Sequence, residues 1–485
     1  MAEQGLRNTT VKGVGWSFTD SILNQGITFL VGIVLARLLS PEEYGLLGIL
    51  MIFIVISEGI VNSGLSNALI RKQGATEEDY NTVFLTNLVL SFAMYGVLFL
   101  CAPLIGVFFD KPQLSVLLRV IGVMVILNAL SLVPNAKLVK KVDFKTITYC
   151  SFTASVISGV VGISMALTGY GVWALVGQQV VRQLTLTIAL WIANRWLPQL
   201  QFSVASFKEL WGFGWKLLVS GLINNIWNEI YKVVIGKCYT PQTLGQYTQA
   251  HFYADLFSRN MTNVIQRVSY PVLSQMQDEK ERLKQAYRQV IKVTMLVTFV
   301  FMFGLAGCAK QFIYVLIGDQ WLPCVHYLQI ICLFMALYPL HAINLNMLQV
   351  QGRSDLFLKL EIIKKCIGVI PLLLGIFVNI YWMLLGTVVT GWIAYYLNAY
   401  YSGPYLDYSV LMQIRDITPS MTLALCMAVV VFAIGLLPLS PYILLPVQII
   451  TGAAIVFGVC ELTHLEEYAE IKQIIMNIAH KNNRQ

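Results

Sequence analysis

Long apolar runs are the feature of this sequence that most constrains its fold. Most of them reach 20 residues, and an α-helix needs roughly 20 residues to cross the hydrocarbon core of a membrane at about 1.5 Å per residue. Hydrophobic residues make up 57% of the 485 residues and charged residues only 12%. This composition excludes a water-soluble enzyme and a disordered chain. The sequence therefore predicts an all-α polytopic membrane protein.

Fourteen apolar segments are long enough to be spans. The first follows Arg7 and Lys12 and resembles a secretory signal, but it is too long and ends in Ser-Pro-Glu-Glu, without a small-residue cleavage site. We therefore expect it to be retained. The predicted spans cover residues 11–39, 44–69, 83–109, 114–138, 147–167, 172–193, 207–236, 246–273, 290–309, 321–350, 356–377, 381–401, 417–437 and 442–462.

Basic residues predict which side of the membrane each loop faces. With the N-terminus placed in the cytoplasm, 21 Lys and Arg residues fall in inner loops and tails, and three fall in outer loops. Such an excess marks the cytoplasmic side, so both termini are predicted to be cytoplasmic. The net charge of +8 could suggest nucleic acid, but the charges lie at the ends of apolar runs on one side of the membrane. No nucleic-acid partner is expected.

An internal repeat organises the chain. The segment Gly-Val-Gly-Trp (13–16) corresponds to Gly-Phe-Gly-Trp (212–215), and Pro41 corresponds to Pro241, about 200 residues later. Six spans separate the copies, and an even number preserves their orientation, as in parallel-repeat transporters. We predict two pseudo-symmetric six-helix lobes, residues 1–200 and 201–405, with two further spans and a cytoplasmic tail in 406–485. Two such lobes are expected to enclose a cleft and to work by alternating access.

Polar residues recur at helical spacing in four of these spans, so that each set defines one helix face. Polar faces are costly in lipid, and the four faces are therefore expected to line the cleft. Hydrogen bonds between neighbouring helices are the alternative role for the neutral members. The predicted cavity or coupling residues are Asp20, Asn24, Glu58, Asn62, Asn228, Glu229 and Asp255.

Basic residues outnumber acidic residues inside the spans, nine to five. A positively charged cavity suits an anionic ligand, and guanidinium groups bind phosphate through paired donors. Two pairs, Asp255 with Arg259 and Glu229 with Lys232, could instead neutralise each other. The predicted residues for an anionic head group are Arg259, Arg119 and Arg182, followed by Lys232 and Arg267.

Motifs for enzymatic chemistry are not found in the sequence. It has neither a Gly-x-x-x-x-Gly-Lys-Ser/Thr loop nor a His-Glu-x-x-His motif, and its nine cysteines form no Cys-x-x-Cys pair. We predict no enzyme activity, no cofactor and no metal site. Glu58, Asp255 and Asp20 are the candidates for binding a coupling proton or Na⁺, because transport needs an energy source.

Three segments carry a resemblance to a known family. Gly-Val-Gly-Trp (13–16), Leu-Ser-Pro-Glu-Glu-Tyr-Gly-Leu (39–46), and residues 64–72 followed by 79–84 resemble the Wzx-type oligosaccharide flippases of the multidrug, oligosaccharidyl-lipid and polysaccharide exporter superfamily. The resemblance implies a V-shaped, two-lobed fold. It also implies movement of a polyprenyl-diphosphate-linked oligosaccharide from the inner to the outer leaflet of a bacterial inner membrane, for O-antigen, capsule or exopolysaccharide synthesis. In related lipid II flippases, extra C-terminal helices form a groove for the lipid tail.

Two other functions stay open. Cation-coupled multidrug efflux on the same fold would favour an acidic cavity, because its substrates are cations. A polysaccharide polymerase or ligase would need a long external loop with acid or base groups, and no predicted outer loop exceeds about fifteen residues. The partners expected of a flippase are its lipid-linked substrate, membrane lipids and polysaccharide assembly proteins.

Overall fold

The computed structural model describes residues 23–482, apart from the side chains of residues 260, 263, 264, 267, 268, 270, 271, 354, 474, 475 and 477–482. This part of the chain is helical, beginning with Leu23–Leu38, as predicted. The later elements are α2 (Pro41–Asn62), α3 (Leu65–Arg71), α4 (Glu77–Phe108), α5 (Gln113–Ile121), α6 (Val123–Lys140), α7 (Phe144–Leu167), α8 (Val172–Asn194), α9 (Val204–Cys238), α10 (Pro241–Gln275), α11 (Lys280–Ile317), η1 (Asp319–Trp321), α12 (Cys324–Met335), α13 (Tyr338–Val350), α14 (Ser354–Phe377), α15 (Ile380–Ser402), η2 (Gly403–Leu406), α16 (Val410–Ile434), α17 (Pro441–Thr463) and α18 (Glu466–Asn482).

Several helices begin where the sequence carries a capping signal. Ser40 caps α2, Pro41 follows it, and the Glu43 side chain accepts the Ser40 backbone N–H at 2.6 Å. Thr76 and Asp79 form the same reciprocal arrangement at the start of α4. These capping boxes satisfy backbone N–H groups that a helix N-terminus leaves without partners. The repeated turn at residues 39–46 is thus a helix start.

Nine helical segments among residues 23–482 are long and apolar enough to cross a membrane. The predicted spans at 172–193, 207–236, 246–273 and 356–377 are also helical, as α8, α9, α10 and α14, but they are more polar. The chain is therefore an integral membrane protein, and the count of fourteen spans stays a prediction.

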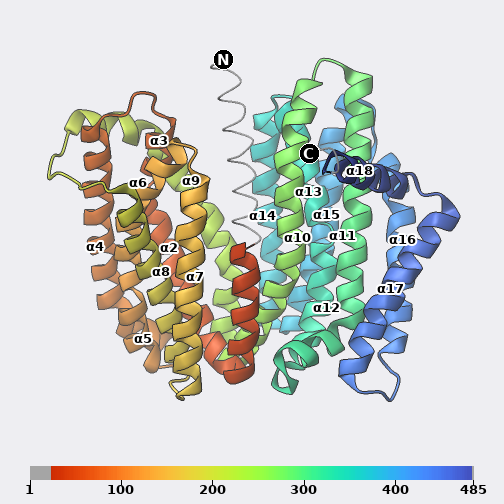
Figure 1. Ribbon diagram of the computed structural model, residues 1–485, viewed down its shortest axis with the longest axis horizontal. Helices are drawn as coiled ribbons and strands as arrows, with labels where there is room; N and C mark the ends of the chain where they lie inside the picture. Colours follow the sequence, from red (N-terminus) through yellow and green to blue (C-terminus); the bar gives the residue numbers. More distant parts are fainter. Residues whose placement is uncertain (1–22, 483–485) are drawn as a thin grey trace. The chain divides into compact units, whose positions relative to one another are not determined.

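The chain forms two compact units, which divide between Gly245 and Gln246. In the first unit, α7 packs on α8, α4 packs on α6, and α9 packs against both α2 and α3 (Figure 1). By the sequence repeat α9 belongs to the second copy, yet it packs within the first unit. The predicted boundaries at 200 and 405 follow the repeat and stay predictions.

In the second unit, α11 packs against α12, α16 and α17. A buried polar cluster ties four of this unit's helices together. Asn344 Oδ1 on α13 accepts hydrogen bonds from Tyr287 of α11 at 2.8 Å, Ser402 of α15 at 2.8 Å and Gln413 of α16 at 3.2 Å. The last helix, α18, runs crosswise to α11 and packs against it (Figure 1).

The two copies of the repeated turn meet within the first unit. A Cβ atom added to Gly45 would lie 1.8 Å from the carbonyl oxygen of Pro241, and one added to Gly245 would lie 1.8 Å from that of Pro41. The contact is reciprocal, as a two-fold relation between the copies would produce. Only glycine allows the starts of α2 and α10 to approach so closely.

Gly45→Ala is therefore expected to destabilise the protein by about 1–3 kcal/mol, the usual range for overpacking a close contact. The matched control is Gly32→Ala, since a Cβ at that helical position meets nothing within 4 Å. Thermal unfolding of the purified protein in detergent measures the difference. Equal midpoints for the two variants would contradict the contact.

Candidate functional site

Charged side chains on α10 in the second unit form the first candidate site. Asp255 lies between two partners on the same helix, with Oδ2 3.1 Å from His251 Nδ1 and Oδ1 3.0 Å from Arg259 Nε. The Arg259 contact is an ion pair whose angle does not make a hydrogen bond. The spacing of four residues stacks these side chains along one helix face. Sequence analysis predicted Asp255 and Arg259 here but missed His251, one turn earlier.

The position of Arg259 is fixed from α12 and α13. The neighbouring Ser258 donates its hydroxyl to the carbonyl oxygen of Met335 at 2.7 Å. The guanidinium carbon of Arg259 then lies 5.7 Å from the centre of the Tyr338 ring, which gives a cation–π contact. The ion pair with Asp255 is made through the Nε atom of Arg259, and the Arg259 side chain is 41% exposed. The described residues therefore enclose this side chain only in part.

Glu229 and Lys232 on α9 form a more buried ion pair in the first unit. Lys232 Nζ lies 2.8 Å from a Glu229 carboxylate oxygen, and the side chains are 25% and 11% exposed. A buried, satisfied pair gains little by exchanging its partner for a ligand. Asn228, which was predicted to line the cavity, is exposed on the same helix. The geometry favours a structural role for this pair over the anion role predicted for Lys232.

Other predicted polar residues of the first unit contact neighbouring helices. Asn24 bonds to Ser151 and Ser155 of α7, at 2.9 Å in each case, so it joins two helices. Glu58 of α2 makes a side-chain hydrogen bond with Asn128 of α6. The Oδ1 atom of Asn62 is buried and has no hydrogen-bond partner among the described residues.

The remaining predicted basic residues lie elsewhere. Arg119 on α5 packs 4.5 Å from the centre of the Phe99 ring and donates its Nε–H to the Phe99 carbonyl at 3.4 Å. Arg182 is an exposed residue of α8. The role predicted for Arg119 and Arg182 in binding an anion stays a prediction. Asp20 and the side chain of Arg267 fall outside the described residues.

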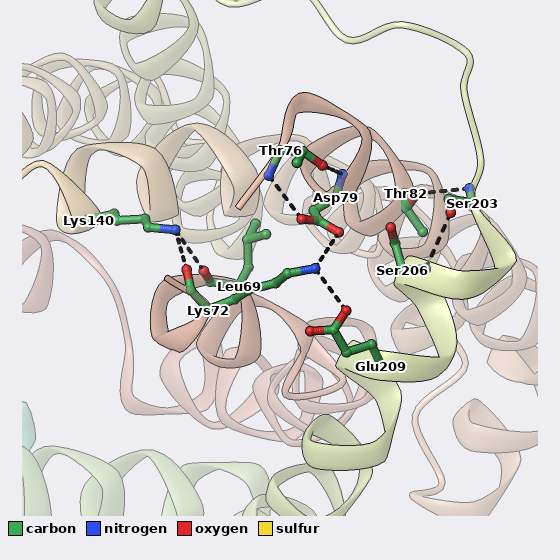
Figure 2. Close-up of polar contacts among 9 residues, drawn as sticks. All are labelled: Leu69, Lys72, Thr76, Asp79, Thr82, Lys140, Ser203, Ser206 and Glu209. Carbon is green, nitrogen blue, oxygen red and sulfur yellow. Dashed lines mark hydrogen bonds and ion pairs between the residues drawn. The ribbon is translucent and has the colours of Figure 1, made fainter. Parts of the chain in front are cut away.

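A second polar cluster, around Lys72, gives structural roles to two of the segments that resemble the flippase family, residues 64–72 and 79–84 (Figure 2). Lys72 Nζ donates to Asp79 Oδ1 at 3.0 Å and to Glu209 Oε2 at 2.9 Å, which links α4 and α9 to the loop after α3. Lys140 of α6 donates to the carbonyl oxygens of Leu69 and Lys72 at 3.5 Å and 2.6 Å. The Lys140 ammonium group thus supplies hydrogen bonds to carbonyl groups at the C-terminal end of α3, where a positive charge is also favourable.

The start of α4 also holds the chain that leads into α9. Asn81 accepts the Gln199 backbone N–H at 3.0 Å. Thr82 accepts the Ser203 backbone N–H at 3.0 Å (Figure 2). Val83 and Phe84 then enter an apolar core with Leu69 of α3. Each residue from 79 to 84 thus has a structural partner or a core position. The capping box at residues 76–79 was the signal from which part of this cluster could have been found.

The fold is shared with solved transporters. The lipid II flippase MurJ in an inward closed conformation matches with a TM-score of 0.73 and 16% identity, covering 94% of this chain and 99% of that chain. An inward-facing multidrug resistance transporter of the MATE family, from the MOP superfamily, matches with a TM-score of 0.60 and 17% identity, covering 81% of this chain and 96% of that chain. These matches define the class as the all-helical MurJ and MATE transporter fold.

Family membership follows from the sequence. Residues 34–326, more than half of the chain, match the family described as polysaccharide biosynthesis protein, and the chain belongs to that family. It is 28% identical over 313 residues to the succinoglycan biosynthesis transport protein ExoT of Rhizobium meliloti (strain 1021), covering 64% of this chain and 63% of ExoT. It is 22% identical over 376 residues to the lipopolysaccharide biosynthesis protein WzxC of Escherichia coli (strain K12), covering 76% of each. The teichuronic acid biosynthesis protein TuaB of Bacillus subtilis (strain 168) is 25% identical, covering 62% of this chain and 63% of TuaB.

Lys72→Met is expected to destabilise the fold by about 1–3 kcal/mol, because it leaves the carboxylate of Asp79, whose side chain is 1% exposed, without its cation. The hydrogen bond to Glu209, followed by the contacts with Asp79, raises the pKa of Lys72. The stabilisation is therefore present below the ordinary lysine pKa and is lost as pH rises through the raised pKa. Thermal unfolding against pH checks both points.

The control for this experiment is Lys111→Met. Lys111 pairs with an exposed carboxylate of Glu42 at 3.0 Å, and exposed pairs contribute about 0–1 kcal/mol. A loss in Lys72→Met no larger than in this control would contradict the structural role of the cluster.

Proposed function

We propose that this protein is a flippase that moves a polyprenyl-diphosphate-linked oligosaccharide from the inner to the outer leaflet of a bacterial inner membrane. Membership of the polysaccharide biosynthesis protein family supports the substrate class. The MurJ and MATE fold supports transport by alternating access, without catalysis. In this proposal both termini are cytoplasmic, and a gradient of H⁺ or Na⁺ drives the cycle. The same proposal assigns the chain to O-antigen, capsule or exopolysaccharide synthesis and includes contacts with polysaccharide assembly proteins.

The observation that carries this proposal is the accessible guanidinium of Arg259. Asp255 neutralises part of its charge at Nε, and the Tyr338 ring supports it. The side chain is 41% exposed, and the proposal places the anion at its outer N–H donors. A diphosphate offers several anionic oxygens and would bind these donors in pairs. Asp255 keeps the guanidinium oriented when no substrate is present. The site would therefore bind and release the head group with little rearrangement.

Arg259→Ala is expected to abolish transport while leaving the amount of membrane-inserted protein unchanged. Loss of one charge-assisted contact costs about 1.5–3 kcal/mol, or roughly ten-fold or more in binding. Arg259→Lys keeps the charge but loses the paired donors, so it should retain only part of the activity. The measurement is restoration of surface polysaccharide in a host that lacks its own flippase, with lipid-linked precursor measured in parallel.

Arg282→Ala is the matched control, because Arg282 is an exposed arginine that pairs with Glu279 at 3.2 Å, away from α10. Full transport by Arg259→Ala would remove Arg259 from the site. The two other functions give separate readouts. Multidrug efflux predicts altered drug susceptibility in an efflux-deficient host, and a polymerase or ligase predicts a change in polymer length or attachment without trapped precursor.

A further inference from the structure

The junction between α2 and α3 is a helix break within the first unit. α2 ends at Asn62 and α3 begins at Leu65, and both intervening residues are left-handed, with φ 46° at Ser63 and φ 69° at Gly64. In an uninterrupted helix, the N–H groups of Leu65 and Ser66 would bond to the last carbonyl groups of α2. The break removes those bonds. Irregular backbone of this kind in membrane proteins is tolerated where it is buried in protein or lines a polar site.

Three buried polar atoms without hydrogen-bond partners among the described residues belong to this break and to the helix beside it. They are Asn62 Oδ1, Ser66 Oγ and Asn87 Nδ2. Asn87 of α4 is fully buried and Ser66 is 8% exposed. Asn87 contacts the break directly, since Ser63 Oγ lies 3.3 Å from its Oδ1. A buried polar group without a partner costs about 1–3 kcal/mol, so their occurrence on both sides of one break points to a ligand.

The chemistry of these groups selects the ligand. If the Asn87 amide turns by half a rotation, its Nδ2 donates to Ser63 Oγ and its Oδ1 becomes free. Asn62, Ser66 and Asn87 then each offer an oxygen, beside the carbonyl groups at the C-terminal end of α2. A helix C-terminus carries partial negative charge, which favours a cation. None of these groups titrates near neutral pH, so a proton does not fit.

The coordinating oxygens are uncharged, and this limits the charge of the cation that they can hold. Ca²⁺ and Mg²⁺ are usually held by carboxylates, and the described residues contain no group of three or more His, Cys, Asp or Glu side chains able to hold a metal ion. Glu58 lies four residues before Asn62, which places a single acidic side chain one turn away on the same face of α2. A single positive charge matches this setting.

Helix α9 covers the break. A Cβ on Gly64 would lie 2.3 Å from the carbonyl oxygen of Gly214, and one on Gly214 would lie 3.1 Å from that of Ser63. Two glycines thus bring the α9 backbone against the break, where Ser63 and Gly64 are buried. Electrostatic attraction between a cation and oxygen dipoles is stronger in such a setting.

We propose that the α2–α3 break binds Na⁺ through the side-chain oxygens of Asn62, Ser66 and Asn87 and the C-terminal carbonyl groups of α2. This inference deepens the proposed function and rests on it for the role of the ion, because it assigns a binding site to Na⁺, one of the two ions proposed to drive the cycle.

The test is thermal unfolding of the purified full-length protein in detergent, with NaCl compared with choline chloride at equal ionic strength. Na⁺ should raise the wild-type midpoint saturably, since a ligand that binds only the folded state stabilises it. Asn62→Leu and Asn87→Leu should each lose most of this rise, and Ser66→Ala should weaken the apparent affinity several-fold. Asn87→Asp keeps an oxygen ligand and should keep the response.

Ser158→Ala is the matched control, because Ser158 is a buried serine of the same unit whose hydroxyl bonds to the Ser155 carbonyl oxygen at 3.1 Å. Its Na⁺ response should equal that of the wild type. Midpoints in choline chloride identify any variant that folds poorly, and direct binding of radioactive Na⁺ to the wild type and Ser66→Ala then decides the question. A wild-type midpoint indifferent to Na⁺, or a full response in both leucine variants, would overturn the proposal whatever the transport assays show.

Discussion

Polar groups in a membrane interior need partners, and this requirement governs much of the structure. An unpaired backbone or side-chain group in hydrocarbon costs several kcal/mol by order of magnitude. The protein avoids this cost by sharing acceptors. The side-chain oxygen of Asn344, for example, accepts hydrogen bonds from three other helices. Such a hub fixes the relative positions of α11, α13, α15 and α16 within their unit, because moving one helix would leave a buried donor unpaired.

Two segments of the sequence repeat make close backbone contacts in the structure. Gly214 belongs to the repeated Gly-Phe-Gly-Trp segment, and in the second copy it lets α9 lie against the backbone of Gly64. The repeated turn, in contrast, keeps one purpose in both copies, since Gly45 and Gly245 each allow the close approach of the other copy's proline. Duplication thus preserved the turn, and in the second copy Gly214 brings α9 against the backbone beside α3.

The sequence predicted the helices well and the partners of individual charges poorly. Apolar run length and the capping residues Ser40 and Thr76 are local signals, so α2 and α4 could be placed from them. Lys72 and Glu209 are 137 positions apart in the sequence. The spacing of hydrophobic and polar residues along a helix predicts only contacts between near neighbours, so it could not predict this pair. Asp255 with Arg259 was predictable as a pair because four residues separate them on one helix. His251 escaped notice because a single histidine in a span carries no distinctive spacing.

Helices α16 and α17 follow the two predicted copies of the repeat, and specific contacts fix α16 against the rest of its unit. Arg288 and Tyr408 both hydrogen-bond to Asp416 near the start of α16, while Gln311 donates to the Gly435 carbonyl oxygen beyond its end at 2.8 Å. Between these points Gly307 lets α11 approach the backbone of Ala428, because a Cβ there would lie 2.9 Å from its carbonyl oxygen. Small residues and interhelical hydrogen bonds are the forces available in lipid, where apolar contact alone gives little preference for protein over acyl chains. α16 is therefore held at both ends and in the middle as a fixed part of its unit.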